Sequence, residues 1–377
     1  MRILYICDAL AIYGGLERVL VDKANWLVEK GGYEVSLLTI NQGSHPICFP
    51  LHPDVVYNDL NIRFHQYSYL PFWKRFFKRR QLYHVFRKRL AKKIQEEVPD
   101  IIICTRLDYV RDIVQVKGVI PLVFETHSSC LVSRFEGEGL LHRFYTWYLQ
   151  LAVRKAQMVV ALTNGDADQW RKLTSKVCVI PNVVHLNETG RNSDCHSKSV
   201  IFVGRYTCQK DIQSLLRIWS LVIQRHQDWQ LHIFGGYGNE KEKLQSQMRG
   251  MDMNIVVHES TSTIYEEYLR SSLLLMTSRY EPFGLVLPEA MSCGLPVVAF
   301  DCPYGPADII SDGMDGFLIR NRSTEDYVDK VCLLMEDEEL RRKMGQKGVH
   351  SAQRYNANQV MPQWKKLFEQ IIRTTIK

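Results

Sequence analysis

The sequence lacks the long apolar runs that a membrane-spanning protein needs. Its 377 residues are 46% hydrophobic and 24% charged, which is typical of a soluble globular protein. No stretch reaches the roughly eighteen continuous apolar residues of a spanning helix. The apolar amino terminus is interrupted at Asp8 and shows no cleavage signal, so it predicts a first buried strand and not a signal peptide. We therefore expect a cytoplasmic protein.

Paired cysteine spacings are also missing. The ten cysteines, among them Cys7, Cys104, Cys178 and Cys332, are scattered through apolar runs without the spacing of a zinc site or a disulfide framework. This predicts core thiols in a reducing compartment.

The glycine fingerprint of nicotinamide-binding proteins is absent from both glycine-rich turns. Gly236 and Gly238 are followed by Lys241 where a third glycine would stand. The Gly14-Gly15 pair, between a predicted strand and a predicted helix, lets a phosphate or a sugar approach the backbone closely. A bare glycine pair is more often a simple tight turn.

Short apolar runs alternate with amphipathic stretches in two series. The alternation predicts an α/β fold with parallel strands, in which ligands bind beyond the carboxyl ends of the strands. The predicted strands are 3–7, 33–40, 55–60, 100–105, 121–127, 158–163 and 177–182, then 199–205, 229–238, 254–258, 273–277 and a buried strand within 278–319, where it stands between two helices. We predict a first domain over 1–184, a polar linker over 185–198, a second domain over 199–356 and a last helix within 357–377.

Two carboxylates bracket a predicted helix start in the stretch 278–319. Glu281 precedes a Pro-Phe-Gly turn, and Glu289 lies inside the helix that Pro288 can open. The backbone N–H groups of Phe283, Gly284 and Leu285 lead into this helix and are suited to an anion or a sugar hydroxyl. Alternatively, the acids only favour the helix dipole.

A second acidic pair, Asp166 and Asp168, has the D-x-D pattern that can bind a divalent metal with a diphosphate. It stands at the start of a predicted helix, where acids cap N–H groups and favour the dipole. We therefore predict no metal site here.

The string from Glu281 through Glu289 to Gly294-Leu-Pro-Val-Val resembles the donor-site signature of retaining glycosyltransferases of family 4. The resemblance implies the GT-B fold: two Rossmann-like domains facing each other across a cleft, with the C-terminal helix crossing back to the first domain. It further implies a metal-independent enzyme without a cofactor, of the type that builds bacterial lipopolysaccharide and other surface polysaccharides.

The family resemblance extends to other motifs in the same order along the chain. Arg205 and Lys210, after the strand-end Val-Gly, are similar to the pair that binds the donor diphosphate. Asp211 departs from the family, in which many members carry glycine at this place. The resemblance also implies that Gly15 contacts the donor and that His127, at a strand end, orients the donor sugar.

The same resemblance assigns the two acids of the central stretch. Glu289 is expected to hold the ribose, and Glu281 the hexose hydroxyls. The segment from Cys302 to Asp308 resembles the branch that uses UDP-galactose, UDP-N-acetylgalactosamine or UDP-N-acetylglucosamine. The alternatives are a mannosyl or glucosyl transferase with a GDP- or UDP-donor, an epimerase-like enzyme, and a catalytically silent subunit that binds sugar nucleotides.

The positive charge is concentrated in one aromatic-rich segment. The formal net charge is +7, and cations crowd the predicted helix 74–97. This pattern favours contact with an anionic membrane surface over a solvated basic helix. Nucleic acid could attract the same composition, but no recognised nucleic-acid motif accompanies it. We expect a peripheral protein at the inner face of the plasma membrane, with a lipid-linked or polysaccharide acceptor and membrane contacts from Trp73, Lys74, Arg75, Phe76, Arg79 and Arg80.

Overall fold

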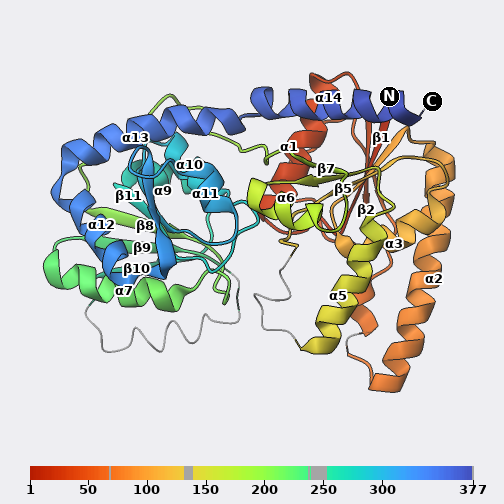
Figure 1. Ribbon diagram of the computed structural model, residues 1–377, viewed down its shortest axis with the longest axis horizontal. Helices are drawn as coiled ribbons and strands as arrows, with labels where there is room; N and C mark the ends of the chain where they lie inside the picture. Colours follow the sequence, from red (N-terminus) through yellow and green to blue (C-terminus); the bar gives the residue numbers. More distant parts are fainter. Residues whose placement is uncertain (68, 131–138, 237, 239–252, 376–377) are drawn as a thin grey trace.

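The computed structural model describes residues 1–67, 69–130, 139–236, 238 and 253–375, and contains two parallel sheets side by side (Figure 1). The first sheet has the strand order β3-β2-β1-β4-β5-β6-β7. Its strands are β1 (Arg2–Cys7), β2 (Glu34–Thr39), β3 (Val56–Asp59), β4 (Ile101–Cys104), β5 (Leu122–Glu125), β6 (Met158–Ala161) and β7 (Val177–Val179).

The second sheet repeats the arrangement with the order β10-β9-β8-β11-β12-β13. Its strands are β8 (Ser199–Val203), β9 (Gln230–Phe234), β10 (Ile255–His258), β11 (Leu273–Met276), β12 (Val297–Phe300) and β13 (Gly316–Ile319). Adjacent strands pair in parallel in both sheets, which confirms the predicted α/β class.

Helices cover the faces of both sheets (Figure 1). Around the first sheet they are α1 (Gly15–Glu29), α2 (Phe72–Glu97), α3 (Leu107–Val116), α5 (Leu140–Val153), α6 (Asn164–Arg171) and the 3₁₀ turn η1 (Phe64–Tyr67). Later in the chain come α7 (Ile212–Arg225), α9 (Ile264–Arg270), α10 (Val286–Ser292), α11 (Gly305–Ile309), η2 (Arg320–Arg322), α12 (Thr324–Glu336), α13 (Glu338–Ala352), η3 (Gln353–Tyr355) and α14 (Ala357–Thr375).

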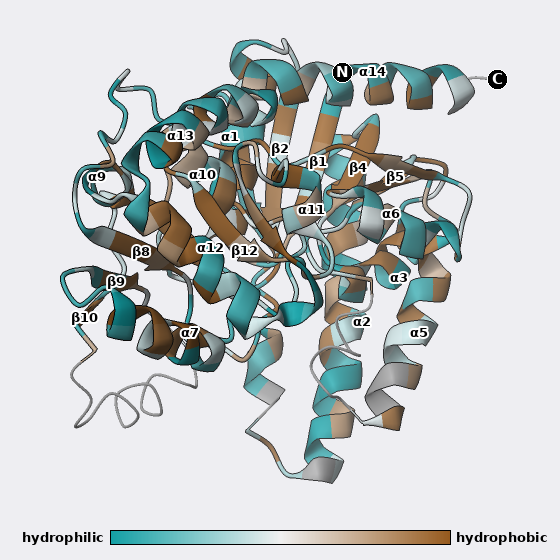
Figure 2. Cartoon of the chain, turned by 60° about the vertical axis from the view of Figure 1, so that its left-hand side comes forward, coloured by the Kyte–Doolittle hydropathy of each residue, from teal (hydrophilic) through white to brown (hydrophobic). Residues whose placement is uncertain are grey.

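The strands form because their apolar residues are continuous. All four residues of β4 and all four of β12 are buried, as expected for strands covered on both faces. Figure 2 shows the strands as hydrophobic bands beneath helices that carry polar outer faces. Among the described residues, no helix has the length and apolar character that crossing a membrane requires.

The last helix, α14, returns to the first sheet, as predicted (Figure 1). Its apolar face joins the core formed by β1 and α1, and its buried contributors are Val360, Met361, Trp364, Leu367, Phe368 and Ile371. The helix that follows the second domain therefore packs against the first domain.

Several predictions about local structure were incomplete. Helix α3 and the edge strand β13 were not predicted. The segment 185–198, predicted as a linker, has no regular secondary structure, yet it packs on the second domain: Ser193 donates its N–H to the carbonyl of Cys293, and Cys195 is buried. The prediction of core thiols is wrong for Cys208, which is exposed in the loop after β8.

The strand order places a topological switch point in each sheet. In the first sheet, the connections after β1 and β4 leave toward opposite sides, and the same holds for β8 and β11 in the second. Open parallel sheets bind ligands at such points, beyond the carboxyl ends of the strands. Gly15 begins α1 after the loop that follows β1, and the loops after β8 and β11 carry Arg205 and Glu281, so three predicted site residues stand at the switch points.

Candidate functional site

Lys210 and Glu281 form the centre of the site. The Lys210 Nζ lies 2.5 Å from Oε1 of Glu281, and the hydroxyl of Ser278 donates to the same oxygen at 2.6 Å. The Glu281 side chain is almost fully buried. A buried carboxylate needs such partners, because removing it from water is otherwise costly. The structure therefore pairs Lys210, which we predicted to bind the donor diphosphate, with Glu281, which we predicted to bind the hexose.

The loop that carries Lys210 is shaped by two unusual positions. A Cβ at Gly204 would lie 3.2 Å from the Lys210 stem, so the glycine leaves room for this stem to fold back toward Glu281. Asp211, the residue that departs from the family, has a φ of 49°, in the left-handed region that favours glycine. Its carboxylate accepts from Arg322 at 2.7 Å, and Arg279 lies 3.3 Å away. These cations account for an acid at a position suited to glycine.

Arg205 precedes this loop and is exposed. Its guanidinium has no ion pair within 4 Å among the described residues, whereas Lys210 is already paired. Burial raises the pKa of the Glu17 carboxyl, and the nearby Arg205 guanidinium acts in the opposite direction with a smaller effect. Arg205 is therefore a cation available at the rim of the cleft, facing the first turn of α1.

Two close approaches connect the domains. A Cβ at Gly15 would lie 2.5 Å from the Leu285 side chain, and one at Gly165 would lie 2.6 Å from the Tyr304 ring. Asn164 also donates its backbone N–H to Asp308. The predicted donor contacts Gly15 and Leu285 thus face each other across the interface, although 270 positions separate them in the chain.

Glu289 lies in the first turn of α10 and has few partners. The Tyr268 hydroxyl donates to its Oε2 at 3.2 Å. Burial raises the pKa of Glu289 to about 7, although Tyr268, Arg18 and Lys210 act in the opposite direction. A carboxylate with one long hydrogen bond from the part of the chain that the structure describes is suited to ligand hydroxyls, because these would supply further donors.

The turn before α10 has a structural component. Gly284 has a φ of 97°, which a residue with a side chain rarely adopts. The Phe283 side chain is buried and meets the Tyr355 ring edge-on with centroids 5.2 Å apart. Phe283 therefore anchors the turn through its ring, and only its backbone is positioned for the predicted ligand contact.

His127 follows β5 and faces an acid. Its Nε2 lies 3.1 Å from Oε1 of Glu125, in an orientation that does not complete a well-directed hydrogen bond. Glu125 is paired with Lys23 of α1. The histidine stands at the carboxyl edge of the first sheet, as predicted, and is supported by an ion pair that the sequence analysis did not identify.

A polar cluster beyond β1 was also missed. Asp8 accepts from Asn41 at 2.7 Å and from the Tyr109 hydroxyl, and these residues come from the loops after β1 and β2 and from α3. The signal available in the sequence was the position of Asp8 immediately after a buried strand. This cluster lies beyond the carboxyl ends of β1 and β2, at the edge where open parallel sheets bind ligands.

The acidic pair Asp166 and Asp168 is divided between two roles. Asp166 is buried and accepts from the Cys130 N–H at 2.8 Å and from the Trp170 indole at 2.9 Å. Asp168 is exposed and pairs with Arg171 at 2.7 Å. Each acid therefore has partners within the fold.

The beginning of α2 presents aromatic and basic side chains to solvent. Trp73, Phe76 and Phe77 are each more than half exposed. Helix α5 runs beside α2, and both project from the first domain (Figures 1 and 2). One predicted membrane contact is already engaged: Arg79 donates to the Tyr145 hydroxyl of α5 at 2.6 Å. Lys74, Arg75 and Arg80 are exposed.

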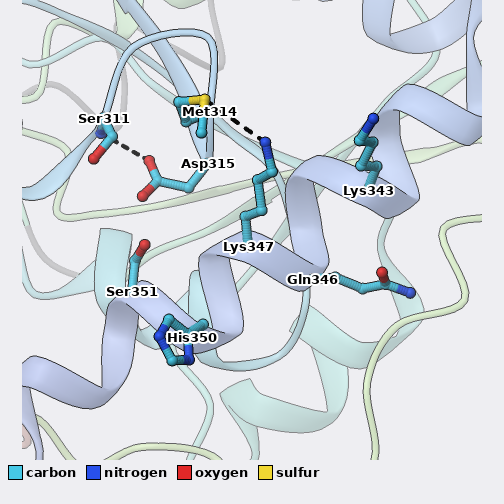
Figure 3. A pocket seen from close by; sticks show the side chains of 8 residues that line it. All are labelled: Ser311, Met314, Asp315, Lys343, Gln346, Lys347, His350 and Ser351. Carbon is cyan, nitrogen blue, oxygen red and sulfur yellow. Dashed lines mark hydrogen bonds between the residues drawn. The ribbon is translucent and has the colours of Figure 1, made fainter.

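A separate pocket lies between α13 and the loop before β13 (Figure 3). None of the predicted site residues lines it. Its lining consists of Ser311, Met314, Asp315, Lys343, Gln346, Lys347, His350 and Ser351.

Two family models match the chain. "Glycosyltransferase Family 4" matches residues 13–188, and "Glycosyl transferases group 1" matches residues 186–350. The first match contains Gly15 and His127, and the second contains Arg205, Lys210, Glu281 and Glu289.

Similar proteins span much of the chain. An uncharacterized glycosyltransferase of Haemophilus influenzae is 27% identical over 93% of this chain and 95% of its own length. A lipopolysaccharide 1,6-galactosyltransferase of Escherichia coli is 30% identical over 61% of this chain and 64% of its own length. A crystal structure of S. aureus TarM with UDP superposes with a TM-score of 0.79 at 16% identity, covering 97% of this chain and 99% of that one. This last likeness establishes the GT-B fold.

Proposed function

The chain belongs to the group 1 glycosyl transferases, and on that premise we propose that it moves a hexose from a UDP-sugar to a surface glycan with retention of the anomeric configuration. The observation that carries the proposal is the grouping at the cleft of two carboxylates and two cations, one of which has no ion pair among the described residues. Arg205, Lys210, Glu281 and Glu289 come from three separate segments of the second domain, and they offer complementary groups for a diphosphate and for sugar hydroxyls.

The leaving group requires positive charge. As the glycosidic bond breaks, charge grows on the diphosphate, and cations placed there stabilise the transition state more than the ground state. Arg205 can offer a bidentate fork, and Lys210 a point charge. In this proposal the two cations take the place of a divalent metal, and no further cofactor takes part.

The carboxylates bind the neutral parts of the donor. Glu289 accepts from the ribose hydroxyls, and Glu281 accepts from the hexose and favours positive charge on the sugar ring. Lys210 connects the two halves of the donor, since it already touches Glu281 and can also reach the diphosphate. His127 orients the hexose from the opposite domain.

The donor is a UDP-sugar carrying galactose, N-acetylgalactosamine or N-acetylglucosamine. The motif from Cys302 to Asp308 supports this choice, as do two of the similar proteins: a lipopolysaccharide galactosyltransferase, and TarM crystallised with UDP and alpha-GlcNAc-glycerol. Mannosyl or glucosyl transfer from a GDP- or UDP-donor is the alternative within the same reaction class.

The acceptor is a lipid-linked or polysaccharide glycan reached at an anionic membrane. The exposed aromatics at the start of α2 supply an apolar contact, and Lys74, Arg75 and Arg80 supply the attraction to acidic lipids. Helix α5 extends this surface with Phe144 and Trp147, which are also exposed.

A donor screen tests the proposed function. Purified protein is incubated with UDP-, GDP-, ADP- and CMP-sugars in the presence of EDTA, while thermal shift and released nucleotide are followed. We expect one UDP-hexose to stabilise the protein and to release UDP slowly, and Lys210→Ala to abolish both effects. Stabilisation without any release, even with candidate acceptors added, would identify a silent binding subunit. No response to any donor would contradict the proposal.

A further inference from the structure

Glu125, which lies next to His127, forms a buried ion pair with Lys23. The Lys23 Nζ donates to both oxygens of Glu125, at 2.6 and 2.7 Å. Each side chain is 1% exposed, so the pair is fully withdrawn from water. Such a pair is often no more stable than apolar residues of equal volume, and its presence therefore calls for a reason other than stability.

The C-terminal helix completes the surroundings of this pair. The Lys23 Nζ lies 3.6 Å from the centroid of the Trp364 ring, which belongs to α14. The ammonium thus meets two carboxylate oxygens on one side and an aromatic face on another, an arrangement that stabilises a buried cation. Trp364 itself is 1% exposed and belongs to the core that α14 shares with α1 and β1.

Glu125 links the ion pair to His127. The Oε1 atom that accepts from Lys23 also lies 3.1 Å from the His127 Nε2. Burial raises the pKa of Glu125, but Lys23 and then His127 outweigh it and lower this pKa to about 2. The carboxylate is therefore ionised at neutral pH. An ionised carboxylate only accepts hydrogen bonds, so Nε2 must carry the proton whenever a small rotation of the imidazole completes a hydrogen bond to Glu125.

We propose that Glu125 is a positioning residue for His127, held in place by Lys23 and by Trp364 of the C-terminal helix. The carboxylate fixes the Nε2–H tautomer, which leaves Nδ1 as the nitrogen that meets a sugar hydroxyl. This inference rests on the proposed function for the role of His127 in the reaction. In this proposal α14 helps to position His127, in addition to connecting the second domain to the first.

The test uses a pair of charge-free substitutions. In the double variant Lys23→Met/Glu125→Gln both charges are removed at nearly constant volume, so the fold is expected to persist. Histidine ¹⁵N NMR reads the His127 tautomer directly, with its signals assigned by comparison with His127→Asn. We expect wild-type His127 to be one tautomer with Nε2 protonated, and the double variant to show the averaged shifts of both tautomers.

Kinetics supply the second readout. In the double variant we expect kcat to fall about 10- to 100-fold, the size typical of a misplaced reacting group, while the donor Kd changes less than threefold. Unchanged tautomer signals and unchanged kcat in a folded double variant would overturn the proposal and leave the ion pair a purely structural feature.

The contribution of α14 has a matched control on the same helix. Trp364→Leu removes the ring over Lys23, and we expect it to shift the His127 signals. Phe368→Leu removes a buried ring one turn later that belongs to the same core without lying over Lys23. Equal shifts of the His127 signals in the two variants would contradict a specific role for Trp364. Since NMR needs no substrate, this inference can fail while the donor screen succeeds, or the reverse.

Discussion

The ammonium of Lys210 lies 2.5 Å from the carboxylate of Glu281, although 71 positions separate the two residues in the chain. The contact joins the loop after β8 to the loop after β11, one on each side of the switch point of the second sheet. In our proposal, the acid holds the lysine at the place where the donor diphosphate binds. Catalytic groups held in this way require little rearrangement when the donor binds.

Replacement of Lys210 should affect stability and binding together. Lys210→Met leaves the nearly buried Glu281 carboxylate with Ser278 as its closest partner, and we expect the free energy of unfolding to fall by about 2–4 kcal/mol. The Kd for a UDP-sugar should rise about 10- to 100-fold, because a charged contact to the diphosphate is lost. Thermal denaturation and calorimetry measure the two effects.

The matched control is Lys198→Met, because Lys198 is an exposed lysine of the same domain that pairs with Asp228. It should cost less than about 1 kcal/mol and leave binding unchanged. Equal effects of the two substitutions would show that the Lys210 contact has no special role.

Glu289→Gln should stabilise the unliganded protein at alkaline pH. The pKa of Glu289 is raised from 4.5 to about 7 by burial, so the folded state binds the proton more tightly than the unfolded chain. Stability is therefore lost as the pH rises from about 4.5 to about 7, and the loss stays constant above this range. Because glutamine is always neutral, we expect the variant to gain about 2 kcal/mol over wild type at pH 8, a gain that shrinks toward pH 5. Denaturant titrations at several pH values measure this difference.

The same substitution should weaken donor binding. A neutral amide accepts the ribose hydroxyls less strongly than a carboxylate, so the Kd for a UDP-sugar should rise about tenfold or more at pH 8. A variant that gains stability and retains full affinity would exclude Glu289 from the ribose site.

Two glycines of α13 should respond oppositely to the same change. A Cβ at Gly345 would lie 1.9 Å from the carbonyl oxygen of Gly294, whereas one at Gly348 would meet the Met291 side chain at an ordinary 3.4 Å. We expect Gly345→Ala to destabilise the second domain by several kcal/mol and Gly348→Ala to stabilise it by about 0.5–1 kcal/mol, through its helix propensity. Thermal denaturation distinguishes them. Similar shifts of Tm would mean that α10 and α13 do not approach each other this closely.

Vesicle binding should depend on the start of α2. Trp73→Ser/Phe76→Ser removes two exposed aromatic side chains, and we expect co-sedimentation with vesicles rich in anionic lipid to fall at least tenfold. Raising the salt concentration should weaken wild-type binding, because the basic side chains act through screened charge. Val119→Ser, which alters a highly exposed apolar residue elsewhere on the first domain, should leave binding unchanged. Equal binding by all three proteins would exclude α2 as the membrane contact.

The sequence was sufficient for most of the fold because parallel strands covered on both faces are continuous apolar runs, such as residues 101–104. Strand β13 was missed because its four residues begin with a glycine and follow a turn, so only their partner β12 identifies them as a strand. The sequence could predict that ligands bind beyond the carboxyl ends of parallel strands. It could not predict which loops meet at a switch point, because this depends on strand order, which no local pattern encodes.

The site shows the same division. Glu281, Glu289, Arg205 and Lys210 were predicted because they belong to a motif with fixed spacing. The pair of Lys23 and Glu125 was not, because a lysine within an amphipathic helix is normally expected to face solvent. The return of α14 places the Trp364 ring over this lysine, and that contact is made by a segment more than 300 positions later in the chain.

Calorimetric titration of UDP tests the central claim most directly. Wild type, Glu289→Ala and Lys347→Ala are compared, because Lys347 lines the separate pocket between α13 and the loop before β13 (Figure 3). Our account predicts one binding site in wild type, retained in Lys347→Ala and weakened at least tenfold in Glu289→Ala. Binding that survives in Glu289→Ala and disappears in Lys347→Ala would place the nucleotide outside the cleft and contradict the account.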